Sequence, residues 1–239
     1  MNNVGIIGFG RFGKILADIL SERFEIYVYD EYESSHEYKN VSFNEIVNLE
    51  VIFLAVPIRS FEELLLKLKD LKLYNTTIID VCSVKIYPVQ LMEKYLPSNV
   101  DIIATHPMFG PDSYGPFREL KMVMYPVRDN FARYEVLKDV FESRSITVVE
   151  MAPQEHDEHA AFSQGITHFI GRVLNEVGVS STKINTLGFN ELLGVIEQTC
   201  NDSWDLFKDL QNYNPYTENM INELEKSIQL VRNKIGDSK

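Results

Sequence analysis

Residues 4–13 read VGIIGFGRFG, a short apolar run that leads into glycines with the spacing G-x-G-x-x-G. The run Val4–Ile7 has the composition of a buried strand, and an amphipathic pattern follows it. In such a motif Gly8 permits a tight turn, Gly10 lets a ligand approach the backbone, and Gly13 lets a helix pack closely on a strand. These residues therefore predict a strand, a tight turn and a helix whose N-terminus can bind a phosphate.

The second predicted strand, Glu25–Tyr29, ends at Asp30. A carboxylate at this place can accept hydrogen bonds from both ribose hydroxyls of NAD and would repel the 2′-phosphate of NADP. We therefore expect a bound dinucleotide, NAD rather than NADP. Its expected binding residues are Gly8, Gly10, Arg11, Phe12, Gly13 and Asp30, with Val56 and Pro57 on the nicotinamide side.

The first part of the chain alternates short apolar runs with amphipathic ones. The predicted strands are Val4–Ile7, Glu25–Tyr29, Val51–Val56, Thr77–Val81, Asp101–Thr105, Met122–Tyr125 and Ile146–Val149. Helical patterns lie between them, and after Met151 we expect helices only, at Pro153–Val177, Thr199–Leu210 and Pro215–Lys234. The prediction is an α/β fold: a Rossmann-type, doubly wound, mostly parallel sheet over residues 1–151 and an all-helical domain over residues 152–239.

Composition excludes several classes of partner. The formal net charge is -12, and an acidic surface repels nucleic acid and anionic lipid. We see no signal peptide and no apolar run of the ~18 residues that a membrane span needs. The two cysteines, Cys82 and Cys200, form no disulfide framework. We therefore expect a cytoplasmic protein with a small-molecule substrate.

A histidine follows the predicted strand Asp101–Thr105, in the run Thr105-His106-Pro107-Met108-Phe109-Gly110-Pro111-Asp112. The proline and glycine residues predict a rigid loop after it. Another strand end carries Ser83 and Lys85 in Asp80-Val81-Cys82-Ser83-Val84-Lys85. Because ligands bind at the carboxyl edge of an open parallel sheet, we expect His106, Ser83 and Lys85 to face one crevice. An imidazole beside a hydroxyl can accept a substrate proton.

A third motif lies in the predicted helix Pro153–Val177 and reads Ser163-Gln164-Gly165-Ile166-Thr167-His168-Phe169-Ile170-Gly171-Arg172. Together with residues 8–13, 80–85 and 105–113, it makes the chain resemble the prephenate/arogenate dehydrogenase family of tyrosine biosynthesis, and most closely the plant-type arogenate dehydrogenases. The resemblance covers nearly the whole chain.

This resemblance implies the oxidative decarboxylation of a cyclohexadienol. Hydride leaves the hydroxyl-bearing ring carbon for a nicotinamide, and carbon dioxide leaves the opposite ring carbon. His106 would accept or polarise the hydroxyl proton, and Ser83 would hydrogen-bond the same region. His168 would help to bind the substrate, and we add Gln164, Thr167 and Lys85 to the substrate-binding set.

Asp112 bears on the choice of substrate. Arogenate carries an ammonium where prephenate carries a keto group, and a carboxylate can pair with the former but would be left unpaired beside the latter. We therefore expect arogenate as the substrate, with prephenate as the alternative; Asp112 can also cap the proline-rich turn. The region Gly188–Thr199 has no Arg or Lys to hold the ring carboxylate. The candidates are Lys85, Arg172, Lys183 or a residue of another subunit.

Other interpretations stay open. The chain could be a different two-domain dehydrogenase acting on a hydroxy acid or imine, or a catalytically silent NAD-binding sensor module. His156 and His159 could bind a divalent metal, but a solvated helix start is the favoured interpretation, and we expect no metal site. The apolar residues Met220, Leu224, Ile228, Val231 and Ile235 form either an internal core or a surface for a second copy. We expect a homodimer through the helical domain.

Overall fold

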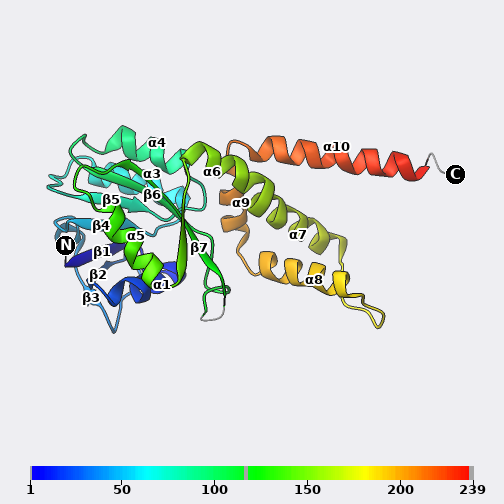
Figure 1. Ribbon diagram of the computed structural model, residues 1–239, viewed down its shortest axis with the longest axis horizontal. Helices are drawn as coiled ribbons and strands as arrows, with labels where there is room; N and C mark the ends of the chain where they lie inside the picture. Colours follow the sequence, from blue (N-terminus) through cyan, green and yellow to red (C-terminus); the bar gives the residue numbers. More distant parts are fainter. Residues whose placement is uncertain (1, 116–117, 237–239) are drawn as a thin grey trace. The chain divides into compact units, whose positions relative to one another are not determined.

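The computed structural model describes residues 2–115 and 118–236 (Figure 1). The chain divides into two compact units, Met1–His156 and Asp157–Lys239, which we call the sheet unit and the helical unit. The domain boundary that the sequence predicts, after residue 151, lies a few residues before the boundary between these two units. Each unit is described by itself.

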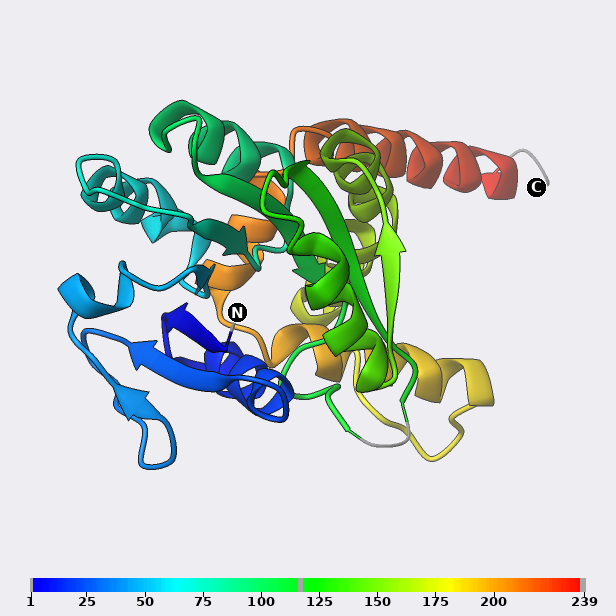
Figure 2. The same cartoon turned by 60° about the vertical axis from the view of Figure 1, so that its left-hand side comes forward.

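An eight-stranded sheet forms the sheet unit, in the order β3-β2-β1-β4-β5-β6-β7-β8 (Figure 2). The strands β1 to β6 are parallel, β7 is antiparallel to β6, and β8 is parallel to β7. This order confirms the doubly wound, mostly parallel sheet, because the chain winds outward in both directions from β1 and β4. The strands are β1 Asn3–Ile7, β2 Glu25–Tyr29, β3 Lys39–Asn40, β4 Val51–Leu54, β5 Thr77–Asp80, β6 Asp101–Pro107, β7 Leu120–Arg128 and β8 Ile146–Glu150.

Helices cover both faces of this sheet because its strands are apolar on both sides. On one face, residues of β1 and β4 pack with α1 and α5 in a single buried cluster, and the rings of Phe53 and Phe141 meet edge to face. On the other face, Gly5 of β1 lies against Ile46 of α2. The helical elements of this unit are α1 Arg11–Ser21, α2 Phe43–Ile46, the 3-10 turn Ile58–Ser60, α3 Phe61–Leu68, α4 Ile86–Tyr95, α5 Tyr134–Ser143 and the start of α6 Pro153–Ala160.

The turn from β1 to α1 depends on two glycines. Gly8 has a φ of +99°, and a Cβ there would lie 2.4 Å from the carbonyl oxygen of Ala55. A Cβ at Gly13 would lie 2.2 Å from the carbonyl oxygen of Gly8. Gly10 differs, since nothing lies within 4 Å of its Cβ position. The first and third glycines therefore close the turn, and the second keeps the backbone open to a ligand.

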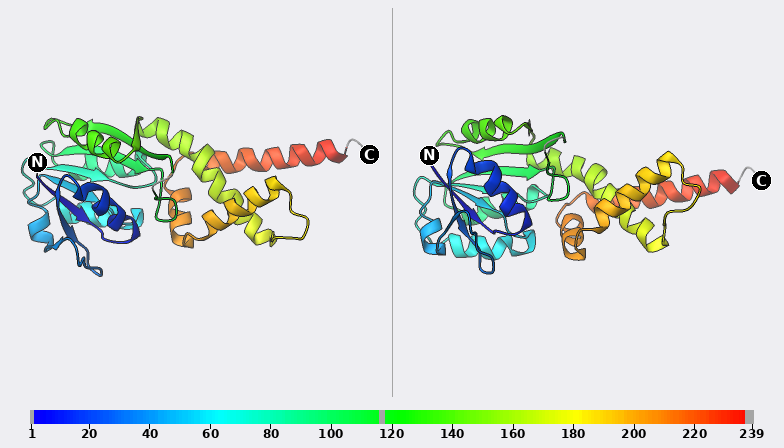
Figure 3. Two further views of the ribbon diagram at one scale, coloured as in Figure 1. Left: turned by 60° about the horizontal axis from the view of Figure 1, so that its bottom comes forward. Right: turned by 90° about the horizontal axis from the view of Figure 1, so that it is seen from below.

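The helical unit differs in part from the prediction (Figure 3). The helix expected over Pro153–Val177 forms, but a π-helical turn, Ala161–Gly165, separates α6 from α7 Ile166–Val177. The sequence pattern missed most of α8 Leu187–Cys200, and the helix expected over Thr199–Leu210 is split by the N-cap Ser203, whose hydroxyl accepts from the N–H of Leu206. The last two helices in the described residues are α9 Trp204–Asn212 and α10 Thr217–Gly236.

Close packing joins α7 to α8 within this unit. A Cβ at Gly171 would lie 2.0 Å from the hydroxyl oxygen of Thr199, so only glycine permits this approach. None of the helices in the described ranges is long and apolar enough to cross a membrane.

Replacing Gly13 by alanine tests the turn. The added methyl group meets a backbone oxygen that cannot move without displacing β1, so we expect Gly13→Ala to lower the free energy of unfolding by about 1–3 kcal/mol, the usual cost of overpacking. Gly10→Ala is the matched control and should stay within about 0.5 kcal/mol of the wild type, because its Cβ enters open space. Thermal unfolding without cofactor measures both; equal stability of the two variants would contradict the role of Gly13.

Candidate functional site

Asp30 links the end of β2 to the glycine turn. Its Oδ2 accepts a hydrogen bond from the N–H of Phe9 at 2.7 Å, and its Oδ1 accepts from the N–H groups of Tyr32 and Glu33 at 2.8 and 3.0 Å. Partial burial alone would raise the pKa of Asp30, but these three donors hold it below its ordinary value. The carboxylate is therefore ionised and fixed beside the turn, where it retains lone pairs for further donors.

The other expected cofactor residues gather around the same turn. Gly10 is the N-cap of α1 and has no side chain to accept from the first N–H groups of the helix. These groups are free to meet an anion, and Arg11 beside them is exposed. Val56 and Pro57 follow β4, the neighbour of β1, and the N–H of Ala55 donates to the carbonyl of Ile7. Val56 is half-buried and Pro57 is exposed.

Lys85 is fully buried, and this corrects the expectation that it faces a substrate. Its ammonium donates to Oδ2 of Asp80 and to the carbonyl of Thr105. Asp80 also accepts from the N–H of Cys82 at 3.1 Å and from the N–H of Thr105 at 3.3 Å. Both side chains are almost entirely shielded, with exposed fractions of 1% and 0%. Lys85 therefore holds β5 and β6 together and is not available to clamp a carboxylate.

His106 lies at the end of β6, where the strand extends beyond its pairing with β5. Its Nδ1 lies 2.8 Å from Nε2 of His156 in α6. Burial lowers the pKa of His106 well below its ordinary value, and electrostatic interaction with His156 and Lys85 lowers it further. His106 is therefore neutral at neutral pH, and a neutral imidazole has one nitrogen that can accept a proton.

His156 is a residue that the sequence interpretation missed. The expectation of a solvated helix start is wrong for His156, because α6 turns its side chain inward and leaves it 2% exposed. The neighbouring His159 is exposed, as expected. Ser83 is half-buried at the end of β5. Among the described residues, the hydrogen bond of His106 goes to His156 rather than to Ser83.

Asp112 forms an ion pair with Arg11. Its Oδ1 lies 2.9 Å from Nη2 of Arg11, and both side chains are more than half exposed. The same loop contacts α1 through aromatic rings, since Phe109 lies between Phe12 and Tyr114 with centroid distances of 6.1 and 5.9 Å. The loop that follows His106 is therefore held against the helix that starts at the glycine turn.

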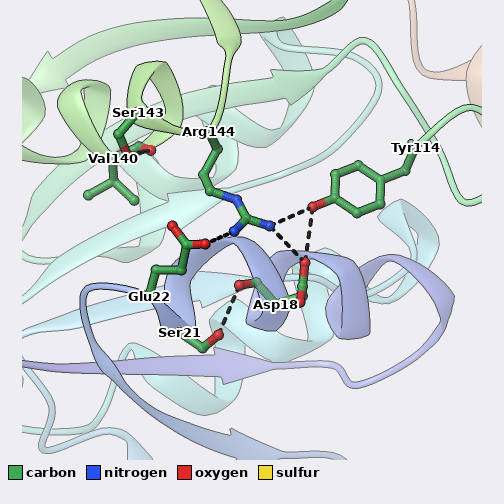
Figure 4. Close-up of polar contacts among 7 residues, drawn as sticks. All are labelled: Asp18, Ser21, Glu22, Tyr114, Val140, Ser143 and Arg144. Carbon is green, nitrogen blue, oxygen red and sulfur yellow. Dashed lines mark hydrogen bonds and ion pairs between the residues drawn. The ribbon is translucent and has the colours of Figure 1, made fainter. Parts of the chain in front are cut away.

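A polar cluster holds Tyr114 of this loop (Figure 4). The hydroxyl of Tyr114 donates to Oδ2 of Asp18 at 3.0 Å and accepts from Nη2 of Arg144 at 3.2 Å. Arg144 also pairs with Asp18 at 3.1 Å and with Glu22. Tyr114 of the loop is thus tied to α1 and to the end of α5.

The expected residues of the helical unit follow one another along the π turn and α7. Gln164 and His168 are half-buried, whereas Thr167 is exposed and its hydroxyl donates to the carbonyl of Ser163 at 2.8 Å. Burial lowers the pKa of His168, and electrostatic interaction with Asp202 acts in the opposite direction without cancelling this effect. Arg172, one turn further, donates to the carbonyl of Asp202, and its guanidinium lies over the rings of Trp204 and Phe207.

Two sequence profiles match the chain. The profile described as prephenate dehydrogenase, nucleotide-binding domain, matches residues 27–127. The profile described as TYRAAT1-like, C-terminal domain, matches residues 173–239.

Two proteins of Arabidopsis thaliana are similar over most of the chain. Arogenate dehydrogenase 2, chloroplastic, is 33% identical over 248 residues, which cover 97% of this chain and 69% of the plant protein. Arogenate dehydrogenase 1, chloroplastic, is 36% identical over 239 residues, which cover 93% of this chain but only 37% of the plant protein. The crystal structure of prephenate dehydrogenase from A. aeolicus in complex with hydroxyphenyl propionate and NAD+ has the same fold. Its TM-score is 0.78 at 20% identity, over 100% of this chain and 92% of that one.

Removing the ammonium of Lys85 tests the buried ion pair. Lys85→Met leaves the carboxylate of Asp80 buried without its cation, so we expect a loss of about 3–5 kcal/mol in the free energy of unfolding at neutral pH. Without the ammonium, burial raises the pKa of Asp80 more strongly. An acid whose folded-state pKa is raised stabilises the fold below that pKa, so the stability deficit of Lys85→Met should shrink as the pH falls.

The double variant Asp80→Asn/Lys85→Met is the control for this prediction. It removes both charges, so its loss should be smaller than that of Lys85→Met alone. Denaturant unfolding at neutral and acidic pH measures all three proteins. A double variant that is less stable than the single one would contradict the interpretation.

Proposed function

Because this chain belongs to the arogenate/prephenate dehydrogenase family of oxidoreductases, we propose that it catalyses the oxidative decarboxylation of arogenate to tyrosine with hydride transfer to a nicotinamide cofactor. The observation that carries the proposal is the neutral, buried His106 at the carboxyl edge of the sheet, next to the loop that bears Asp112. The alternative within the family is prephenate as substrate, which would give 4-hydroxyphenylpyruvate.

The glycine turn and Asp30 fit a dinucleotide. The open space at Gly10 and the uncapped N-terminus of α1 would receive the pyrophosphate, with Arg11 beside it. Phe12 and Gly13 belong to the same helix start, and Val56 and Pro57 would line the nicotinamide. The ionised Asp30 would accept from the ribose hydroxyls, which favours NAD over NADP. When bound, the cofactor supplies the hydride acceptor.

His106 is the proposed proton acceptor. Its low pKa keeps the ring unprotonated at neutral pH, so that one nitrogen can accept the hydrogen of the substrate hydroxyl as the carbon–oxygen bond gains double-bond character. Ser83, half-buried at the neighbouring strand end, is assigned a hydrogen bond to the same hydroxyl region. The loss of carbon dioxide makes the ring aromatic, so the reaction is driven in one direction.

Asp112 is the proposed selector between the two substrates. A carboxylate stabilises an ammonium next to it and disfavours a keto acid. In the ion pair with Arg11 this carboxylate is more than half exposed, so exchanging Arg11 for a substrate ammonium costs little.

The remaining substrate contacts are assigned to the helical unit. Gln164, Thr167 and His168 carry the family motif and are proposed to bind substrate. Because Lys85 is committed to Asp80, the candidates for holding the ring carboxylate are Arg172, Lys183 or a residue of another subunit.

We propose in addition that the protein is a homodimer through its helical unit. The apolar side chains of the second half of α10 support this, since Ile228, Val231 and Ile235 are 53%, 57% and 66% exposed, whereas Met220 at its start is buried. The cytoplasmic location stays a prediction, and both plant relatives are described as chloroplastic.

The first test is turnover. Incubation with NAD or NADP and either arogenate or prephenate should reduce the nicotinamide and release carbon dioxide, faster with NAD and with arogenate. His106→Asn removes the proton acceptor, so we expect kcat to fall by about 10²–10⁴-fold while NAD affinity is unchanged. If the wild type turned over neither substrate, the proposed function would be wrong, and a different dehydrogenase or a silent NAD-binding module would be left.

The second test is the substrate preference of Asp112→Asn. The variant cannot pair with an ammonium, so the ratio of kcat/KM for arogenate to that for prephenate should fall by about tenfold, which corresponds to ~1.4 kcal/mol. Asp18→Asn, in α1, removes the carboxylate that accepts from the Tyr114 hydroxyl in the same loop; it is a control for loop anchoring and should affect both substrates equally. An unchanged ratio in Asp112→Asn would remove this role from Asp112.

A further inference from the structure

His156 contacts the proposed proton acceptor, and the proposed function gives it no task. The Nδ1 of His106 and the Nε2 of His156 are 2.8 Å apart, and the ring planes meet at 72° with centroids 5.0 Å apart. The two residues are only 3% and 2% exposed. Because water does not compete for a hydrogen bond between buried groups, this contact fixes the orientation of both rings.

The hydrogen bond between the rings has two possible proton arrangements. A neutral imidazole carries a proton on one nitrogen and a lone pair on the other. If His106 donates through Nδ1, its lone pair lies on Nε2; if His156 donates, the proton of His106 lies on Nε2. Since Nδ1 is occupied by His156, Nε2 is the nitrogen that is left for a substrate. Only the first arrangement allows Nε2 to accept a proton.

In many enzymes a carboxylate orients the catalytic imidazole, but the carboxylate of Asp80 on the neighbouring strand accepts hydrogen bonds from other groups. Its Oδ2 accepts from Lys85 and from the N–H of Cys82, and its Oδ1 accepts from the N–H of Thr105. A carboxylate against His106 would also favour the imidazolium form and raise the pKa of the acceptor. An imidazole partner orients the ring and does not add a negative charge.

We propose that His156 is a positioning residue that holds His106 in the tautomer with its proton on Nδ1, so that the lone pair of Nε2 meets the substrate hydroxyl. The inference rests on the proposed function, which assigns the proton acceptor to His106. In the step, the O–H bond of the substrate breaks and an N–H bond forms at Nε2, and the bound cofactor would supply the acceptor for the hydride of the ring carbon. The imidazolium that results keeps its Nδ1–H bond to His156.

The tautomer can be observed in the protein without substrate. Nitrogen-15 NMR of histidine-labelled protein distinguishes a protonated ring nitrogen from one with a lone pair, and comparison with His106→Asn assigns the signals. We expect a proton on Nδ1 of His106 and a lone pair on Nε2. The opposite tautomer would overturn the proposal. Because the measurement needs no turnover, it is independent of whether the proposed function holds.

Kinetics of two variants test the consequence. His156→Leu removes the acceptor, so kcat should fall by about 10²–10³-fold, with KM and NAD affinity within about threefold of the wild type. In His156→Gln, Oε1 can accept near the position of Nε2, so kcat should recover to within about tenfold of the wild type. His159→Leu, an exposed residue on the same helix, is the control and should be fully active.

A wild-type kcat in a folded His156→Leu would overturn the proposal. If His156→Leu does not fold, the NMR measurement is made on His156→Gln instead. Retention of the Nδ1 proton of His106 in His156→Gln would support the positioning role, and a shift of this proton to Nε2 would exclude it.

Discussion

The buried ion pair between Asp80 and Lys85 is the interaction on which the carboxyl edge of the sheet depends. Each partner binds the other and also the backbone of Thr105, so the end of β5, the loop after it and the end of β6 become one rigid piece. A buried ion pair is weak evidence for stability, because desolvation cancels much of the attraction. Its effect here is geometric: it fixes the residue that precedes His106.

One partner of the ion pair also contributes to the low pKa of the histidine. Burial lowers the pKa of His106, and electrostatic interaction first with His156 and then with the ammonium of Lys85 lowers it further, so the ring is kept in the form that accepts a proton. A carboxylate partner would have had the opposite effect, whereas the imidazole of His156 fixes the orientation without adding negative charge. The imidazole of His156 thus affects both the orientation and the pKa of the acceptor, and Lys85 adds to the lowering of this pKa.

The sequence predicted the parts of the site that depend on local chemistry. The glycine turn and the place of Asp30 beside it could be predicted because sterics and spacing within one β-α-β unit determine them, while their role in binding a cofactor stays a prediction. Lys85 was misassigned, since a charged residue after a strand is usually solvated and its partner is known only once β5 and β6 pair. His156 was missed for the same reason: its helix start is rich in polar residues, and only the fold brings it to His106.

The ion pair between Arg11 and Asp112 connects the proposed cofactor site with the proposed substrate site. Arg11 lies at the helix start that fits a pyrophosphate, and Asp112 lies in the loop after the proton acceptor, yet they pair with each other. Because the pair is exposed, it is worth at most about 1 kcal/mol, and an anion at Arg11 can replace Asp112 at little cost. The loop itself would stay in place, since Phe109 packs on Phe12 and Tyr114 is bonded to Asp18 and Arg144. Binding of a dinucleotide would therefore release the carboxylate of Asp112 for a substrate ammonium without moving the loop that carries it.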